Sequence, residues 1–327
     1  APYKNCLVLG HVCDKNGKKM SKRLGNYTDP WDVMNKQGAD AMRWYFYSSN
    51  HPWVNVRFFD DAVTESQKEF LMTLKNVYAF FTIYANIDGF DPSTAVCMAG
   101  RRPVQERALV DRWILSELQL TTAQVVAHMD AYRVYEATQV LTDLVDALSN
   151  WYVRRSRDRF WAPGLGPDKL DAHWTLYECL VTLAKLLAPF LPFAAEDIWQ
   201  NLVVRVQPGL RDESVHFCDY PEPDARVIDE GLSRVMRTVR EVVSLGLQVR
   251  TAQKLRVRQP LEAADIVLAD PGLAGALAEH LELVRGGTVV ELIGASRGVE
   301  GTIRVGSGEV GGRVGRGLRV GRGFCIG

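Results

Sequence analysis

The feature that most constrains the fold of this chain is a helical spacing of apolar residues over most of its length. Apolar side chains recur at steps of three and four in successive segments, which proline, glycine or polar stretches separate. Long antiparallel helices with short connections form bundles, so the pattern predicts a mainly α protein with a helical bundle in its middle part. The segments span residues 63–81, 110–125, 134–152, 177–188 and 228–243.

The first fifty residues have a different pattern. The apolar run "NCLVLGHVCD" (5–14) predicts a buried strand, and Asn16-Gly17 predicts a tight turn after it. Asp29 followed by Pro30 is typical of a helix start, and Gly38 is typical of a helix end. We therefore expect a strand, a turn and short helices before the first long helix.

The C-terminal part departs from the helical pattern again. Apolar runs at 261–270 and 288–294 predict strands on either side of a helix at 271–284, as a small α/β unit. Residues 298–327 contain 11 Gly and 5 Arg, so no packed core is expected there and the tail is predicted to be disordered. We interpret the sequence from about Arg285 onward as a frameshift or truncation artefact. The rival interpretation is a genuine Gly/Arg-rich RNA-binding tail.

Composition excludes several classes of protein. The formal net charge is zero, so any binding to nucleic acid must depend on local patches of charge. Six cysteines are scattered without a C-x-x-C pair, which predicts reduced cytosolic thiols and no metal site. No run of eighteen apolar residues occurs, so no membrane span and a cytoplasmic location are expected.

The stretch "GKKMSKRLGN" (17–26), which we call the basic loop, combines four cations and a hydroxyl with no carboxylate. In a mobile loop, Lys19, Ser21, Lys22 and Arg23 could hold the phosphates of a nucleoside triphosphate. Ammonium groups that reach a departing pyrophosphate only in the transition state would lower the barrier to its release. The alternative is a hairpin tip that is basic for solubility.

Lys19-Met20-Ser21-Lys22-Arg23 resembles the KMSKS signature loop of class I aminoacyl-tRNA synthetases. It follows a strand and an Asp14–Lys18 turn and precedes L-G-N, as in that family. The resemblance implies that Lys22 is the main pyrophosphate contact, Lys19 its partner, and Ser21 a loop-positioning or phosphate-contacting hydroxyl. Arg23 departs from the commoner final Ser and is a variant of eukaryote-like members.

The resemblance covers about residues 1–295. "GADAMRWYFYSS" is similar to the helix that follows the signature loop in isoleucyl, valyl and leucyl enzymes, and "DRWILSEL" to the first helix of their anticodon-binding bundle. "SNWYVRRSRDRFW" resembles isoleucyl-tRNA synthetases of the eukaryote-like type more than the valyl or leucyl relatives, which remain the alternative.

The stretch around residue 155 combines cations with aromatic rings. Guanidinium groups hold phosphates and aromatic faces stack unpaired bases, so this stretch is a candidate tRNA-binding surface. The alternative is that the aromatic residues 151, 152, 160 and 161 belong to the core while the arginines pair with Asp146 or Asp158; we favour the core for the aromatics and an RNA contact for the arginines. The candidate residues are Trp151, Arg154, Arg155, Arg157 and Arg159.

Two further features invite a catalytic interpretation that we reject. Leu9-Gly10-His11 faintly resembles the other class I motif, His-x-Gly-His, but that motif opens a helix and this one lies in a predicted strand. The Asp60-Asp61 pair is expected to cap a helix rather than to form a catalytic dyad.

The resemblance also implies a division into parts. It implies the end of a class I catalytic (Rossmann-type) domain at 1–50, a helical connector at 51–102, an anticodon-binding helical bundle at 103–225, a helix with a small α/β junction at 226–295, and the tail at 296–327.

It further implies ATP with Mg²⁺ as a substrate, tRNA(Ile) and isoleucine as partners, a monomer, and no metal site in this part. We expect a C-terminal fragment, inactive alone, of an isoleucine-tRNA ligase. The alternatives are a non-catalytic RNA-binding module and a structural helical scaffold, neither of which explains why Lys19, Ser21 and Lys22 occur together.

Overall fold

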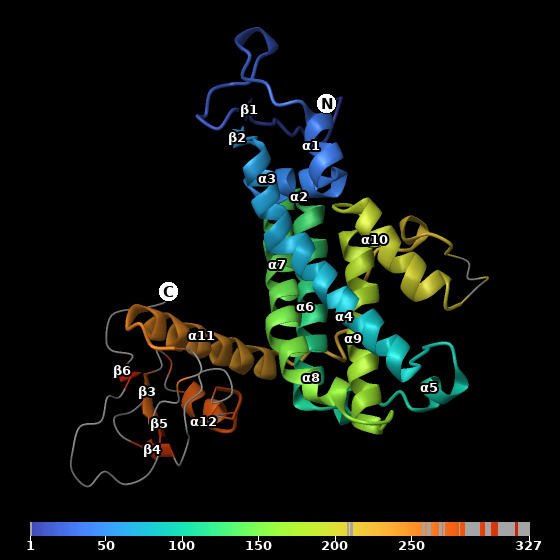
Figure 1. Ribbon diagram of the computed structural model, residues 1–327, viewed down its shortest axis with the longest axis vertical. Coiled ribbons are helices and arrows are strands. Elements are labelled where there is room, and N and C mark those ends of the chain that lie inside the picture. Colours follow the sequence, from blue (N-terminus) through green and yellow to red (C-terminus); the bar gives the residue numbers. More distant parts are fainter. Residues whose placement is uncertain are drawn as a thin grey trace. The chain divides into compact units, whose positions relative to one another are not determined.

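The computed structural model divides the chain into two compact units, Ala1–Ile228 and Asp229–Gly327, which we describe separately (Figure 1). The structure describes residues 2–207, 209, 212–256, 259, 263–267, 270, 272–280, 282–284, 295–297, 302–306 and 318–319. Helices dominate the first unit, which confirms the predicted mainly α class.

The first unit begins with a minimal sheet that flanks short helices. β1 (Val12–Cys13) pairs in parallel with β2 (Val56–Arg57). Asp29 caps α1 by accepting a hydrogen bond from Trp31 N at 2.9 Å, and Gly38 ends α1 with a φ of +95°. Both termini of this helix were predicted correctly, because their signals are local. The helices between the strands are η1 (Lys22–Leu24), α1 (Pro30–Gln37) and α2 (Ala39–Ser48).

The predicted buried strand at 5–14 is wrong for most of its length. Only Val12 and Cys13 form a strand, and the side chains of Leu7, Val8 and Leu9 are 54%, 74% and 68% exposed. A strand with two apolar faces needs neighbours that cover both of them. Here a two-residue partner covers one short segment, so only Cys13 is buried.

A long helix then runs as three segments, α3 (Asp60–Ser66), η2 (Gln67–Met72) and α4 (Thr73–Asp88). The predicted Asp60-Asp61 cap is displaced by one residue. Phe59 is the N-cap residue and makes no side-chain cap bond, while both aspartates lie in the first turn. Their negative charge still suits the positive end of the helix dipole, and Asp60 also pairs with Lys36 at 2.8 Å.

The bundle consists of three long helical stretches that pack side by side. α6 packs on both the α7 stretch and α9, and α4 runs obliquely across α7, η4 and α9 (Figure 1). Trp113, Leu141 and Leu180 are among the side chains buried between them. The elements are α5 (Ala95–Ala99), η3 (Val104–Glu106), α6 (Leu109–Asp130), α7 (Val134–Asp146), η4 (Ala147–Val153), α8 (Arg154–Trp161), α9 (Pro167–Leu187), α10 (Pro192–Trp199), η5 (Gln200–Val204) and η6 (Val215–Phe217).

In the described part of the first unit, three helices contain a π-helical turn: η2 lies between α3 and α4, η4 between α7 and α8, and η5 at the end of α10. A π turn closes its hydrogen bonds one residue later than an α turn, so it accommodates an extra residue without ending the helix. As a result, α7 continues through η4 into α8 as one helix from Val134 to Trp161.

Two polar contacts fix the N-terminal segment on the bundle. The Arg43 guanidinium on α2 donates to Pro189 O at 2.7 Å and to Phe190 O at 3.1 Å, beyond the end of α9. The Asp40 carboxylate accepts from Ala194 N at 2.7 Å and so caps the start of α10. The segment that carries the basic loop is therefore tied to the bundle within one unit.

The second unit combines one long helix with a small sheet. α11 (Glu230–Ala252) is capped by Asp229, which accepts from Leu232 N at 2.9 Å. The sheet has the strand order β4-β5-β3-β6, with β3 antiparallel to β5 and parallel to β6. The elements are β3 (Ala263–Val267), α12 (Leu273–Ala278), β4 (Ala295–Arg297), β5 (Thr302–Gly306) and β6 (Leu318–Arg319).

The predicted strand at 261–270 and helix at 271–284 therefore correspond to β3 and α12, whereas the predicted strand at 288–294 lies outside the described residues. Most of the Gly/Arg-rich tail also lies outside them, so its interpretation stays a prediction. Among the helices that the structure describes, none is both long and apolar enough to cross a membrane.

Candidate functional site

The basic loop leaves β1 through a short hairpin turn. Asp14 N donates to Lys18 O at 2.8 Å, and the Asp14 Oδ1 atom accepts from Asn16 N at 2.9 Å and from Lys18 N at 3.0 Å. Gly17 has a φ of +81°, which this turn requires and which favours glycine. A bridge between Cys13 and Lys19 closes the turn, so Lys19 leaves it with extended backbone.

The cations of the basic loop face solvent. Lys22 to Leu24 form the turn η1, which Gly25 ends with a φ of +65°. Lys19, Lys22 and Arg23 are exposed, and none of them forms a salt bridge with any residue that the structure describes. Lys22 Nζ lies 5.5 Å from the centre of the Tyr27 ring. The three cations are therefore available to an anionic ligand.

A residue that the sequence analysis did not select holds this loop together. The Asn26 side chain accepts from Ser21 N at 3.0 Å and donates to Asp14 Oδ2 at 2.9 Å and to Lys19 O at 3.2 Å. The hydrogen bond from Asn26, followed by that from Lys18 N, lowers the pKa of Asp14 below its usual value. The only sequence signal for this role was the position of Asn26 at the end of the loop.

The structure separates the arginines predicted to bind tRNA. Arg154 and Arg157 are exposed on α8, whereas Arg155 is half-buried with its guanidinium carbon 4.6 Å from the centre of the Trp151 ring. Burial, and secondly the neighbouring Arg154, lowers the pKa of Arg155. Stacking on an aromatic face holds a guanidinium in one orientation.

Arg159 instead contacts carboxylates of the bundle. It donates to Asp111 Oδ1 at 2.9 Å and to Asp111 Oδ2 at 2.7 Å, and its Nε donates to Asp168 at 2.9 Å. The buried Tyr152 hydroxyl donates to Asp111 Oδ1 at 2.7 Å. The sequence alternative had expected pairing with Asp146 or Asp158, but for Arg159 the partners lie on α6 and at the start of α9.

The aromatic residues of the same stretch are divided between core and surface. Tyr152 and Phe160 are fully buried, as predicted. Trp161 is 57% exposed, so its predicted place in the core is wrong; its indole Nε1 donates to the Tyr84 hydroxyl at 2.6 Å. Trp151 is half-buried beneath Arg155.

A buried polar cluster joins α4 to α9. His173 Nε2 lies 2.8 Å from Asp88 Oδ2, and Lys169 pairs with the other oxygen of the same carboxylate. The His173 Nδ1 atom is buried and has no hydrogen-bond partner in the described part of the chain. Burial lowers the pKa of His173 below its usual value; Asp88 acts in the opposite direction, and Lys169 adds to the lowering.

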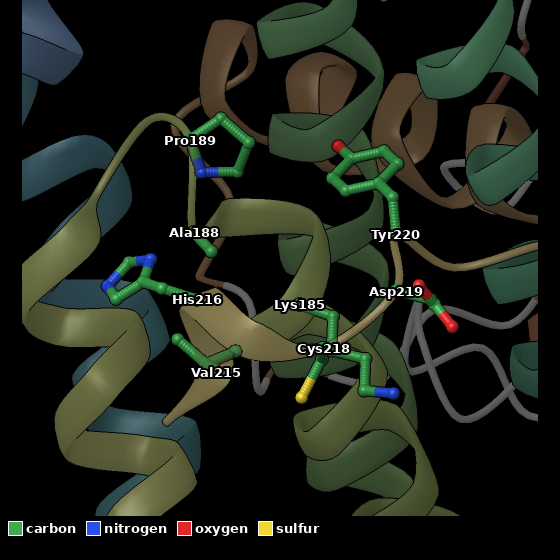
Figure 2. A pocket seen from close by; sticks show the side chains of 8 residues that line it. All are labelled: Lys185, Ala188, Pro189, Val215, His216, Cys218, Asp219 and Tyr220. Carbon is green, nitrogen blue, oxygen red and sulfur yellow. The ribbon is translucent and has the colours of Figure 1, made fainter. Parts of the chain in front are cut away.

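Two cavities are lined by residues that the structure describes. One of about 190 Å³ has His216 on one side and Asp219 and Tyr220 on the other, with Lys185 between them (Figure 2). Burial raises the pKa of Tyr220 to about 12, and its hydroxyl donates to Leu186 O at 3.0 Å. A larger hollow of about 400 Å³ lies between α4, α9 and η5. No residue predicted to bind ATP or tRNA lines either cavity.

Within the described ranges, no group of three or more His, Cys, Asp or Glu side chains could hold a metal ion. In the same part of the chain the cysteines are unpaired: Cys13, Cys97 and Cys179 are buried, Cys218 is half-buried, and Cys6 is exposed. The sixth, Cys325, lies outside the described residues.

Comparison with known families places these features in one class. Residues 1–56, which contain the basic loop, match the family "tRNA synthetases class I (I, L, M and V)". Residues 111–265, which run from the first turn of α6 past the end of α11, match "Anticodon-binding domain of tRNA ligase". A signature loop joined to such a bundle therefore defines the class as class I tRNA synthetases.

Similar proteins of known sequence narrow the class. The isoleucine–tRNA ligase of Clostridium acetobutylicum is 46% identical over 259 residues, which is 79% of this chain and 24% of that protein. The isoleucine–tRNA ligase of Dehalococcoides mccartyi strain 195 is 47% identical over 270 residues, 83% of this chain and 26% of that protein. The chain belongs to the isoleucine–tRNA ligase family, which confirms the prediction of an isoleucyl relative.

The chain spans about a quarter of the length of the curated relatives it matches. These relatives are bacterial, and the narrower prediction of a eukaryote-like type stays a prediction. A solved structure also shares the fold: the LeuRS of Agrobacterium radiobacter K84, in a ternary complex with tRNA and LeuAMS. It matches with a TM-score of 0.50 and 22% identity, over 68% of this chain and 24% of that one.

Proposed function

We propose that this chain is the pyrophosphate-gripping and tRNA-binding part of an enzyme that joins isoleucine to tRNA(Ile), converting ATP to AMP and diphosphate. The observation that carries the proposal is the basic loop, in which the exposed Lys19, Lys22 and Arg23 have no salt-bridge partner among the described residues. The segment that contains it matches class I synthetases, and it is tied to a bundle of the anticodon-binding family.

In the first step, the isoleucine carboxylate attacks the α-phosphorus of ATP and diphosphate departs. Lys22 and Lys19 would donate hydrogen bonds to the diphosphate oxygens as their charge increases, and Arg23 and Ser21 would add further donors. A charge-assisted hydrogen bond is worth about 1.5–3 kcal/mol, and each 1.4 kcal/mol corresponds to about tenfold in rate. Two such lysines would therefore contribute roughly a hundredfold or more.

Mg²⁺ would enter this site with the triphosphate. The basic loop contains no carboxylate, and the nearby Asp14 already accepts three hydrogen bonds. The protein groups in this part of the site therefore suit the phosphates rather than the ion. When bound, the ion would neutralise part of the phosphate charge.

The tRNA surface would be the exposed side of α8. Arg154 and Arg157 would contact phosphates, and Arg155 stacked on Trp151 would present both a charge and an aromatic face. Arg159 would act by holding α8 on the bundle through Asp111. A monomer in the cytoplasm, where thiols stay reduced, belongs to the same proposal.

Amino-acid-dependent exchange of pyrophosphate into ATP tests the proposed reaction. We expect the complete protein that contains this segment to support exchange with isoleucine far better than with valine or leucine. A preference for valine or leucine would assign the protein to a relative of this family, and the absence of exchange with all three would contradict a ligase.

Experiments on the isolated chain test whether it carries only part of the catalytic site and whether it binds tRNA by itself. We expect it to support no isoleucine-dependent exchange but to shift tRNA(Ile) in a gel more strongly than a non-cognate tRNA. Exchange by the isolated chain would contradict the proposal that it carries only part of the site. Equal shifts of both tRNAs would contradict cognate recognition by this part.

A further inference from the structure

We propose that Asn26 is a positioning residue that divides the basic loop into a fixed arm, residues 19–21, and a free turn, residues 22–25. Only the roles that we assign to Lys19 and Lys22 in catalysis rest on the proposed function. The division itself is a property of the chain, because it follows from which backbone groups are bonded to the rest of the fold.

The Asn26 side chain bonds to both sides of the arm. Its Oδ1 accepts from Ser21 N at 3.0 Å, and its Nδ2 donates to Lys19 O at 3.2 Å and to Asp14 Oδ2 at 2.9 Å. The orientation of the amide follows from these partners, since Oδ1 faces a donor and Nδ2 faces two acceptors. Asp14 is held in turn by Asn16 N and Lys18 N.

Met20 anchors the same arm independently. Its backbone N donates to Val12 O at 3.1 Å, next to the bridge between Cys13 and Lys19. Its side chain packs against the buried cluster formed by Val33, Ala41, Tyr45, Phe58 and Val63. Displacing the arm would therefore break backbone bonds and expose apolar surface at the same time.

The turn that follows has no comparable anchor among the described residues. Leu24 N donates to Ser21 O at 3.1 Å, where the turn joins the arm, and Gly25 N donates to Lys22 O at 3.3 Å within the turn; neither bond reaches another part of the fold. A Cβ atom added at Gly25 would meet nothing within 4 Å, so the left-handed Gly25 lies in open space. The backbone of Lys22 and Arg23 can therefore move while the arm stays in place.

The division gives the two lysines different roles. Lys19 stands on a fixed backbone, so its ammonium reaches a bound triphosphate by side-chain rotation alone and contributes to binding ATP. Lys22 stands on the free turn and can follow the diphosphate as it departs. An interaction made only in the transition state raises kcat, whereas one made equally in the ground state lowers KM.

Hydrogen exchange of the intact 327-residue chain tests the division without any activity. We expect the amides of Met20 and Ser21 to be protected and those of Lys22 and Arg23 to exchange freely. Asn26→Ala should speed exchange at Ser21 about fivefold or more, since a lost hydrogen bond is worth about 1 kcal/mol or more. Amides of α6 serve as the control for an intact fold.

A swapped pair supplies the conservative rescue. In the double variant Asp14→Asn and Asn26→Asp, the carboxylate at 26 can accept from Ser21 N and from the amide at 14, which still accepts from Lys18 N. It cannot donate to Lys19 O, so we expect this variant to restore part of the protection at Ser21, whereas Asn26→Asp alone should not. Two results would overturn the fixed arm. One is that the Ser21 amide exchanges as fast as the Lys22 amide in the unchanged chain, and the other is that Asn26→Ala leaves exchange at Ser21 unchanged.

Kinetics of the complete protein test the roles. We expect Lys19→Ala mainly to raise KM for ATP and Lys22→Ala mainly to lower kcat, each about tenfold or more. Asn26→Ala should raise KM, because the backbone of Lys19 is no longer fixed, and the swapped pair should restore KM only in part, because it lacks the bond to Lys19 O. Equal changes of KM and kcat in both lysine variants would overturn the division of roles. Because hydrogen exchange needs no substrate, failure of the proposed ligase activity would leave its result unaffected.

Discussion

The Arg159 guanidinium donates two hydrogen bonds to the Asp111 carboxylate, at 2.9 and 2.7 Å, and so joins α8 to α6 inside the bundle. The Asp111 side chain is fully buried and also accepts from the Tyr152 hydroxyl. The Asp111 carboxylate on α6 therefore binds side chains from both η4 and α8. Because α8 carries the candidate tRNA-binding residues, its attachment to the bundle depends strongly on Asp111.

Arg159→Ala should lower the free energy of unfolding by about 3 kcal/mol or more, because it leaves the Asp111 charge buried without its main partner. Urea unfolding followed by circular dichroism measures the loss. Arg154→Ala, on the exposed side of the same helix, is the matched control and should change stability by less than about 0.5 kcal/mol. Similar losses in both variants would show that the pair contributes little.

His173 predicts a pH dependence of stability. Burial holds its pKa below the usual value of 6.5, with Asp88 opposing and Lys169 reinforcing the shift. Below pH 6.5 the unfolded chain takes up the proton first, so stability should fall as the pH drops from about 6.5 through the pKa of the folded state.

His173→Gln should remove this part of the pH dependence. The measurement is the difference between the two proteins in free energy of unfolding, taken from about pH 7.5 to about pH 5, because the common carboxylates cancel in it. An unchanged slope in the variant would assign the pH dependence to other groups.

The exposed arginines of α8 predict a salt-dependent contact with tRNA. Arg154→Ala combined with Arg157→Ala should weaken binding of the chain to tRNA and reduce the slope of log affinity against log salt by about one for each phosphate that is no longer bound. Lys68→Ala, which removes an exposed cation from η2, is the control. A lower affinity with an unchanged slope would contradict phosphate binding by these arginines.

Asp40 predicts a measurable contribution of helix capping. Asp40→Ala removes the acceptor for Ala194 N at the start of α10 and should cost about 1 kcal/mol of stability. Thermal or urea unfolding measures it against Asn35→Ala, an exposed position of α1, which should be nearly neutral. Equal stability of the two variants would show that water replaces the cap.

Signals between residues that are close in the sequence predicted much of this fold. Features that depend on contacts between residues far apart in the sequence were not predicted. The spacing of apolar residues predicted the long helices, and Asp29, Pro30 and Gly38 predicted the ends of α1, because both signals lie within a few residues. The strand at 5–14 was wrong because an apolar run says nothing about whether neighbouring strands cover it.

The candidate site shows the same limit. The composition of the basic loop selected Lys19, Lys22 and Arg23, which the structure places in solvent. Asn26 was missed because its role depends on the chain folding back twelve residues to Asp14. Arg159 was expected near Asp146 or Asp158, but its partner Asp111 lies 48 residues away on another helix.

The π turn η4 sets the phase of the helix that follows it. Deleting one residue within Ala147–Val153 would let the backbone continue as a regular α-helix, and such a change would cost little locally. Because the π turn already absorbs one extra residue, this deletion would leave the residues from Arg154 to Trp161 nearly in phase with α7. Deleting a second residue would exceed what the turn absorbs and would rotate Arg159 away from Asp111 by about 100° around the helix axis. The π turn therefore allows this helix to lose one residue, but not two, before the candidate tRNA-binding surface changes its orientation.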